Sequence, residues 1–84
     1  MPVGVPMPTI KYIGPYRFFF YSGDRSEPPH IHVERENNVA KFWLNPVRLQ
    51  TSGGFRPQEI RRLQRLIEEQ EQEFLAAWHA YFGD

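Results

Sequence analysis

The sequence predicts an α+β fold, in which a small antiparallel meander sheet of three to four strands is packed by one long C-terminal helix. Two observations support this prediction. Residues 16–51 contain short stretches rich in aromatic and β-branched side chains, separated by polar turns with Gly, Pro or Asn. From residue 57 to about residue 82 the apolar side chains instead recur every three or four positions, as they do on one face of a helix.

The chain has 84 residues, which is enough for one small domain. Three Pro and one Gly occupy the first eight positions, so we divide the chain into a flexible or extended N-terminal arm (residues 1–8) and a single α+β domain (residues 9–84). A core of this size only marginally offsets the entropy of the chain. We therefore expect a homodimer or a small protein partner.

The expected strands follow one another in the first part of the chain. Residues 16–22 carry aromatic side chains on both faces, which is typical of a central strand. The Pro-Pro pair at 28–29 favours extended backbone into a second strand, which bears His30 and His32. The turn at residues 36–38 then leads into a third strand over residues 39–44, and residues 47–51 form a short edge strand.

The C-terminal helix is predicted to begin at Pro57, a residue suited to the first helical position, and to end at Gly83. At this length it would measure about 39 Å, whereas a strand of seven residues spans about 23 Å. The helix should therefore overhang its sheet. Its aromatic end, which includes Phe74 and Trp78, either covers the flank of the domain or packs on a second chain.

Composition excludes several classes of protein. The chain has no Cys, and therefore no disulfide, no Cys-based zinc site and no thiol nucleophile. Its apolar runs are far shorter than the roughly 20 residues that span a bilayer, and we expect a cytoplasmic protein that does not enter the membrane. Ten basic and ten acidic residues cancel, so nucleic acid is not the favoured partner.

The His-bearing strand is the strongest candidate for a functional site. Side chains alternate along a strand, so His30 and His32 should share one face, opposite Ile31 and Val33, and lie off the core. Such a pair can bind a metal, carry out acid–base chemistry, respond to pH, or form the polar side of a half-buried strand. The sequence leaves these alternatives open.

A catalytic site without metal would use the same residues. His30 and His32 would act as general base and acid, with Asp24 orienting an imidazole and Lys41 stabilising negative charge. This arrangement would suit RNA cleavage, although the neutral charge of the chain opposes it. Asp24 has a structural alternative, because it can shape the loop before the strand through a turn with the backbone.

Basic residues are concentrated near the start of the helix. Arg61, Arg62 and Arg65 could form a surface that binds an anion or an acidic partner, with Trp43 as a stacking platform on the third strand. The structural alternative is that Arg65 pairs with a glutamate three or four residues later, and that Trp43 is buried in the core or at a dimer interface.

The order of these motifs resembles the bacterial domain of unknown function 4160 family. The resemblance covers residues 7–83 and includes Asp24, Pro-x-His-x-His-Val from Pro28, Ala-Lys-Phe-Trp-Leu at 40–44, and Glu-Ile-x-x-Leu in the helix with Trp78 near its end. Genes of this family often stand beside those of a second small family, domain of unknown function 2442. The resemblance therefore implies an interaction protein in a two-gene module of toxin–antitoxin type.

A second similarity concerns metal binding. His30-x-His32 followed by Glu36 is similar to the first metal motif of cupins, which implies a divalent metal held by these three residues. The chain departs from cupins because it has too few strands and no later His-bearing motif. A small metal-dependent or His-based hydrolase or nuclease is therefore our alternative function, and a purely structural homodimer is the third.

Overall fold

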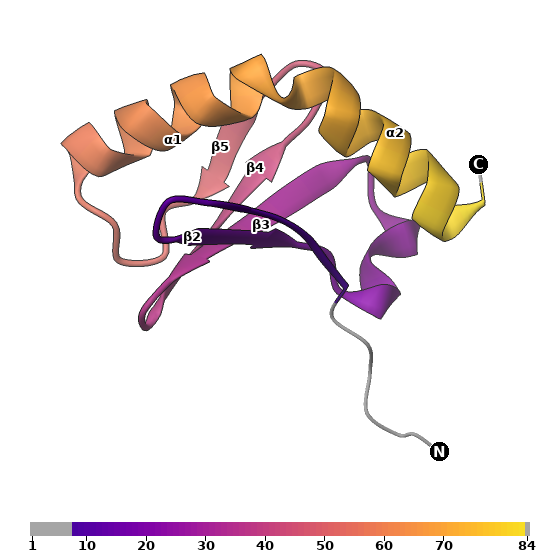
Figure 1. Ribbon diagram of the computed structural model, residues 1–84, viewed down its shortest axis with the longest axis horizontal. Coiled ribbons are helices and arrows are strands. Elements are labelled where there is room, and N and C mark those ends of the chain that lie inside the picture. The colour runs from indigo at the N-terminus through magenta and orange to yellow at the C-terminus, as the bar shows by residue number, and fades with distance from the viewer. Residues whose placement is uncertain (1–7, 84) are drawn as a thin grey trace.

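The computed structural model describes residues 8–83, which form a five-stranded antiparallel sheet with two helices on one of its faces (Figure 1). Each strand pairs with the next in the chain, as expected for a meander. The predicted α+β class is confirmed, with five strands in place of three to four. The strands are β1 (Thr9–Ile13), β2 (Tyr16–Phe19), β3 (His30–Arg35), β4 (Asn38–Trp43) and β5 (Arg48–Thr51).

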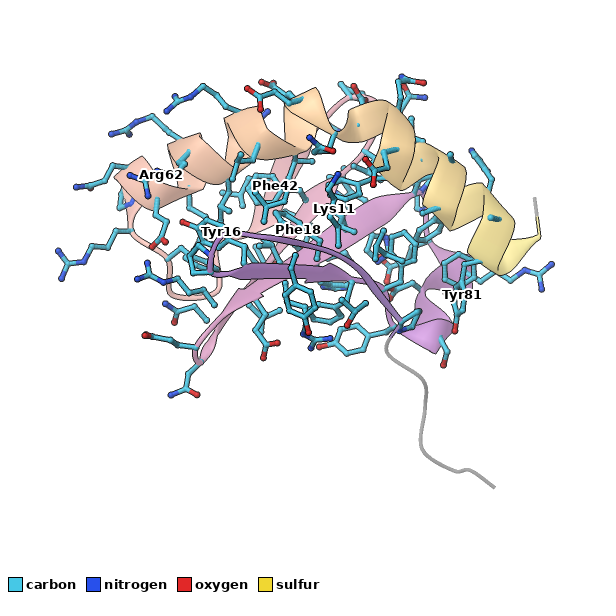
Figure 2. All side chains as sticks on the ribbon, viewed as in Figure 1. Lys11, Tyr16, Phe18, Phe42, Arg62 and Tyr81 are labelled. Carbon is cyan, nitrogen blue, oxygen red and sulfur yellow. The ribbon has the colours of Figure 1, made fainter. Side chains whose placement is uncertain are left out.

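The additional strand is β1, which the sequence analysis did not identify. It lies antiparallel to β2, with Tyr12 opposite Arg17. The turn that joins the two strands contains Gly14, which has a φ of 55°. Lys11 projects from β1 toward the helices, where its Nζ lies 2.9 Å from Gln70 Oε1 and 2.9 Å from Glu73 Oε1 (Figure 2). Residues 1–7 of the predicted arm lie outside the described residues.

The core lies between the sheet and the helices. Alternate side chains of the central strands point to the helical side and are buried there, and apolar side chains of both helices meet them. Phe18, for example, lies with its ring 5.2 Å from that of Phe74. The strands contribute Phe18, Ile31, Val33, Ala40 and Phe42, Phe20 follows β2 directly, and the helices contribute Leu63, Ile67, Phe74, Trp78 and Phe82.

The helical segment consists of two helices, α1 (Pro57–Glu69) and α2 (Glu71–Phe82). The prediction of one long overhanging helix was wrong. At Gln70, φ is −105° and ψ is 9°, and the chain changes direction there (Figure 1). The break brings α2 over the end of the sheet, where Trp78 packs edge-on against Phe20. The aromatic end of the helical layer therefore covers the flank of its own domain.

No helix within residues 8–83 is long and apolar enough to cross a membrane.

A polar network joins α1 to the strands. Glu59 accepts a hydrogen bond from the Tyr16 hydroxyl at 2.6 Å. It also forms an ion pair with Arg35 at 2.7 Å. These two bonds, first Tyr16 and then Arg35, hold the pKa of Glu59 below its ordinary value of 4.5. The ionised carboxylate of Glu59 therefore stabilises the folded state.

We predict that shortening a leucine under the helices destabilises the domain, whereas shortening an exposed one does not. Leu63→Ala removes a fully buried side chain and should lower the free energy of unfolding by about 2–5 kcal/mol. Leu49 is 42% exposed, so Leu49→Ala should change this free energy by less than about 0.5 kcal/mol. Urea unfolding measures both. Equal losses would contradict this packing.

We also predict a pH dependence due to Glu59. Because its folded pKa is lower than 4.5, its contribution to stability is present above this pH and is lost as pH falls through the folded pKa. Glu59→Gln should therefore reduce the free energy of unfolding at pH 7, with a smaller reduction in acid. Glu69→Gln is the control, since Glu69 has no ion pair within residues 8–83. A reduction independent of pH would contradict this role.

Candidate functional site

Three buried side chains meet at one end of the sheet. Asp24 lies in the short 3₁₀ helix η1 (Ser22–Ser26) between β2 and β3, and His30 and His32 lie on β3. The Asp24 Oδ2 atom is 3.0 Å from His30 Nε2 and 3.2 Å from His32 Nε2. One carboxylate oxygen therefore lies against both imidazoles.

The local sequence explains the position of Asp24. Ser22-Gly-Asp-Arg-Ser is polar and turns immediately after the aromatic strand β2. Asp24 Oδ2 accepts the backbone N–H of Tyr21 at 2.9 Å, and the backbone N–H of Glu27 donates to the Asp24 carbonyl at 3.0 Å. Asp24 therefore both shapes the loop and contacts the histidines, two roles that the sequence analysis gave as alternatives.

His30 is held in one orientation. Its Nδ1 lies 2.8 Å from the carbonyl oxygen of Pro28, and because a carbonyl only accepts, Nδ1 must carry the proton of this hydrogen bond. The ring packs edge-on against Trp43 at 5.6 Å and lies 5.0 Å from the ring of Trp78. These contacts direct Nε2 of His30 toward Asp24.

His32 lies between two aromatic side chains of the preceding segment. Its ring stacks on Phe19 at 5.4 Å and lies edge-on to Tyr21 at 4.6 Å. Burial lowers the pKa of His32 below its ordinary value of 6.5, and the neighbouring Asp24 carboxylate offsets this effect only in part. His32 is therefore a neutral imidazole at pH 7, and its Nε2–H donates to Asp24.

The two histidines share one face of β3, as predicted, because both reach the same oxygen while Ile31 and Val33 belong to the core. They lie off the core face, as expected, but both are buried. His30 is 0% exposed and His32 is 7% exposed. The reason is tertiary: η1 folds over this face, and α2 brings Trp78 against His30.

Two other predicted site residues do not join this cluster in the expected way. Glu36 lies exposed in the turn between β3 and β4, four residues from His32, which corresponds to about 13 Å along a strand. The carboxylate beside the two histidines belongs to Asp24 and not to Glu36. Lys41 lies opposite His32 on β4, but its Nζ is paired with Glu27 and lies 4.7 Å from the ring of Trp43.

The predicted basic surface lies on the N-terminal half of α1. Arg61, Arg62 and Arg65 are exposed, and Figure 2 shows Arg62 near the start of the helix. Within residues 8–83 none of the three forms an ion pair, so the alternative pairing of Arg65 with a glutamate is absent. Trp43 is half-buried and packs against His30 on the histidine side of the sheet, whereas these arginines lie on α1.

The signal for Asp24 as the third member of the cluster was weak in the sequence. Asp24 stands six and eight residues before the two histidines, in a loop that contains Gly. The periodicity of the sequence does not predict that this loop folds back over β3. No sequence pattern predicted the contact between His30 and Trp78, because these residues are far apart in the sequence.

These observations define a small α+β domain with a buried carboxylate and two imidazoles on its central strand. The family model described as Domain of unknown function (DUF4160) matches residues 16–79, from β2 to the last turns of α2. The chain therefore belongs to the DUF4160 family, as the sequence resemblance implied. No curated protein and no solved structure matches the chain.

We predict that Asp24 stabilises the fold through its charge. Asp24→Asn keeps the size of the side chain but should lower the free energy of unfolding by about 1–3 kcal/mol, because a buried acceptor of two N–H groups is replaced by an amide. Glu27→Gln removes a more exposed carboxylate paired with Lys41 and should cost less than about 1 kcal/mol. Urea unfolding in a chelating buffer measures both. A larger loss for Glu27→Gln would contradict this assignment.

Proposed function

We propose that this chain is a small interaction protein of the bacterial cytoplasm, one component of a two-gene module of toxin–antitoxin type, and that it binds an acidic protein partner through α1. The observation that carries the proposal is a group of exposed arginines that form no ion pair within residues 8–83. We call it the arginine surface, and it consists of Arg56, Arg61, Arg62 and Arg65.

The distribution of ion pairs supports this proposal. The chain has ten basic residues, and four of them form ion pairs with glutamates within residues 8–83. These four are Lys11, Arg17, Arg35 and Lys41, and none of them lies on α1. The three arginines of α1 are therefore available to a partner, although Glu59, Glu68 and Glu69 balance their charge within the helix.

The position of the arginine surface strengthens the argument. Positive side chains near the N-terminus of a helix oppose the helix dipole, so this arrangement does not favour the isolated domain. Arg62 is close enough to lower the pKa of Glu59, whereas Arg61 and Arg65 stand one turn apart on α1 and are exposed. Carboxylates of an acidic partner would offset this repulsion and pair with the exposed guanidinium groups.

The sheet face opposite the helices is the second part of the proposed surface, but it offers less than the sequence suggested. Phe19, His30 and His32 are buried on that side, while Tyr12 is 68% exposed and Trp43 is half-buried. Most of the aromatic end of α2 is likewise buried, namely Phe74, Trp78 and Phe82, while Tyr81 is 39% exposed. A homodimer would therefore need another surface, and the exposed arginines favour a partner of opposite charge.

The alternative function, a metal-dependent or His-based hydrolase or nuclease, has less support from the geometry. Asp24, His30 and His32 are all buried, and no pocket opens on the surface formed by residues 8–83. Acid–base catalysis requires the substrate to come within hydrogen-bonding distance of these groups. The interaction function needs no such access.

We predict that reversing two charges on α1 weakens the complex with a domain of unknown function 2442 protein, the partner that the family resemblance implies. Arg61→Glu combined with Arg65→Glu should raise the dissociation constant at least about tenfold, or about 1.4 kcal/mol, because attraction becomes repulsion. The effect should shrink at high salt. Titration calorimetry on the co-purified components measures both.

Arg25→Glu is the matched control, since Arg25 is also exposed and has no ion pair within residues 8–83, but lies in η1. It should leave the dissociation constant unchanged. Absence of a complex, or equal weakening by both changes, would overturn the proposed function.

A further inference from the structure

We propose that Asp24, His30 and His32 form a binding site for one divalent transition-metal ion of the zinc type, which fastens η1 to the central strand of the sheet. This site is independent of the arginine surface and of its partner. It rests on three observations: the hydrogen bond that engages His30 Nδ1, the spacing of the donor atoms, and the groups that hold the ligands in place.

The hydrogen bond of His30 Nδ1 to Pro28 leaves Nε2 facing the Asp24 carboxylate. Because Nδ1–H donates to the carbonyl of Pro28, the Nε2 of a neutral His30 carries a lone pair. This atom is fully buried, forms no hydrogen bond, and lies 3.0 Å from the Asp24 carboxylate, which also presents lone pairs. Two lone pairs at this distance repel each other, so a positive charge between them is needed.

The spacing of the donor atoms fits a metal ion. The carboxylate oxygen of Asp24 and one nitrogen from each histidine all lie within 4.8 Å of one another, and two of the three separations are 3.0 and 3.2 Å. Two ligand atoms bound tetrahedrally to one zinc ion at about 2.0–2.1 Å are about 3.3 Å apart. The cluster can therefore receive zinc with small side-chain adjustments.

The surroundings of the ligands are those of a metal site. A histidine that binds a metal through one nitrogen usually donates its other N–H to a carbonyl or carboxylate, as His30 does to Pro28. Asp24 is held by the backbone N–H of Tyr21. Two imidazoles and one carboxylate suit zinc, cobalt(II) or nickel(II), whereas magnesium prefers oxygen ligands.

Metal binding changes one proton in the cluster. His32 now donates its Nε2–H to Asp24, so the metal takes the place of that proton, which moves to Nδ1 of the same neutral ring. His30 needs no change, since its Nε2 is already free. The alternative source of positive charge is a second proton on His30, which would make a buried imidazolium paired with Asp24. The two states differ at Nε2 of His30, which carries a proton only in the imidazolium, and in the nitrogen of His32 that carries its proton.

The test uses the full chain without an affinity tag, stripped of metal at pH 7.5 and titrated with zinc chloride in a calorimeter. We expect about one equivalent to bind, a rise in the melting temperature, and no binding of magnesium chloride. Cobalt(II) should bind at the same site and give a visible absorption band. In ¹⁵N spectra of the zinc-loaded protein, His30 should carry a proton on Nδ1 only.

Variants locate the site. His32→Gln should abolish zinc binding, and Asp24→Asn should weaken it, while circular dichroism checks that both variants fold. The control is His79→Gln, because His79 is exposed on α2 and belongs to no cluster within residues 8–83; it should bind zinc as the original chain does. His30→Gln alters a fully buried residue and could unfold the chain. The decisive variant is therefore folded His32→Gln.

Three results would each overturn this proposal. The first is no zinc binding by the folded chain. The second is binding that survives His32→Gln or is lost in His79→Gln. The third is a doubly protonated His30 that persists in excess zinc, because the imidazolium would then supply the positive charge. The arginine surface remains intact in all of these variants, so its partner binding is measured separately.

Discussion

The structure depends on covering one apolar face of a five-stranded sheet with a helical segment that is longer than the sheet. A straight helix over residues 57–82 would leave its aromatic end in water. The break at Gln70 instead turns α2 over the end of the sheet, where Phe74, Trp78 and Phe82 are buried. The same turn places the ring of Trp78 against His30. The packing of the core therefore determines the surroundings of the candidate site.

Asp24 links the local structure of a loop to the chemistry of β3. Its carboxylate ends the aromatic strand by accepting the N–H of Tyr21, and the same oxygen lies against both histidines. A small domain can bury such a group only if its charge is compensated, since burial of an unpaired charge is costly. The Nε2–H of the neutral His32 supplies part of this compensation, and the proposed metal ion beside His30 would complete it. This need connects the geometry to the proposed metal.

The two candidate sites lie at opposite ends of the long dimension of the molecule. The arginine surface lies where α1 begins, whereas η1 and the buried cluster lie near the end of α2 (Figure 1). Most of the ion pairs in between join neighbouring strands or connect the strands to the helices, as Lys11 does with Glu73. The neutral composition therefore gives no indication of the two candidate sites, the arginine surface and the buried cluster. One would serve a protein partner, and the other would serve the stability of the loop.

Local patterns in the sequence determined the α+β class, the meander order, the apolar helix stripe and the common face of His30 and His32, because strand alternation and helical periodicity are properties of adjacent residues. The same patterns were too weak for β1. Only the tertiary structure decided that the helix breaks at Gln70, that the histidines are buried, and that Asp24 rather than Glu36 completes the cluster. Each of these depends on which distant segment returns to cover a face, and that is set by the packing of the whole domain rather than by the spacing of neighbouring residues.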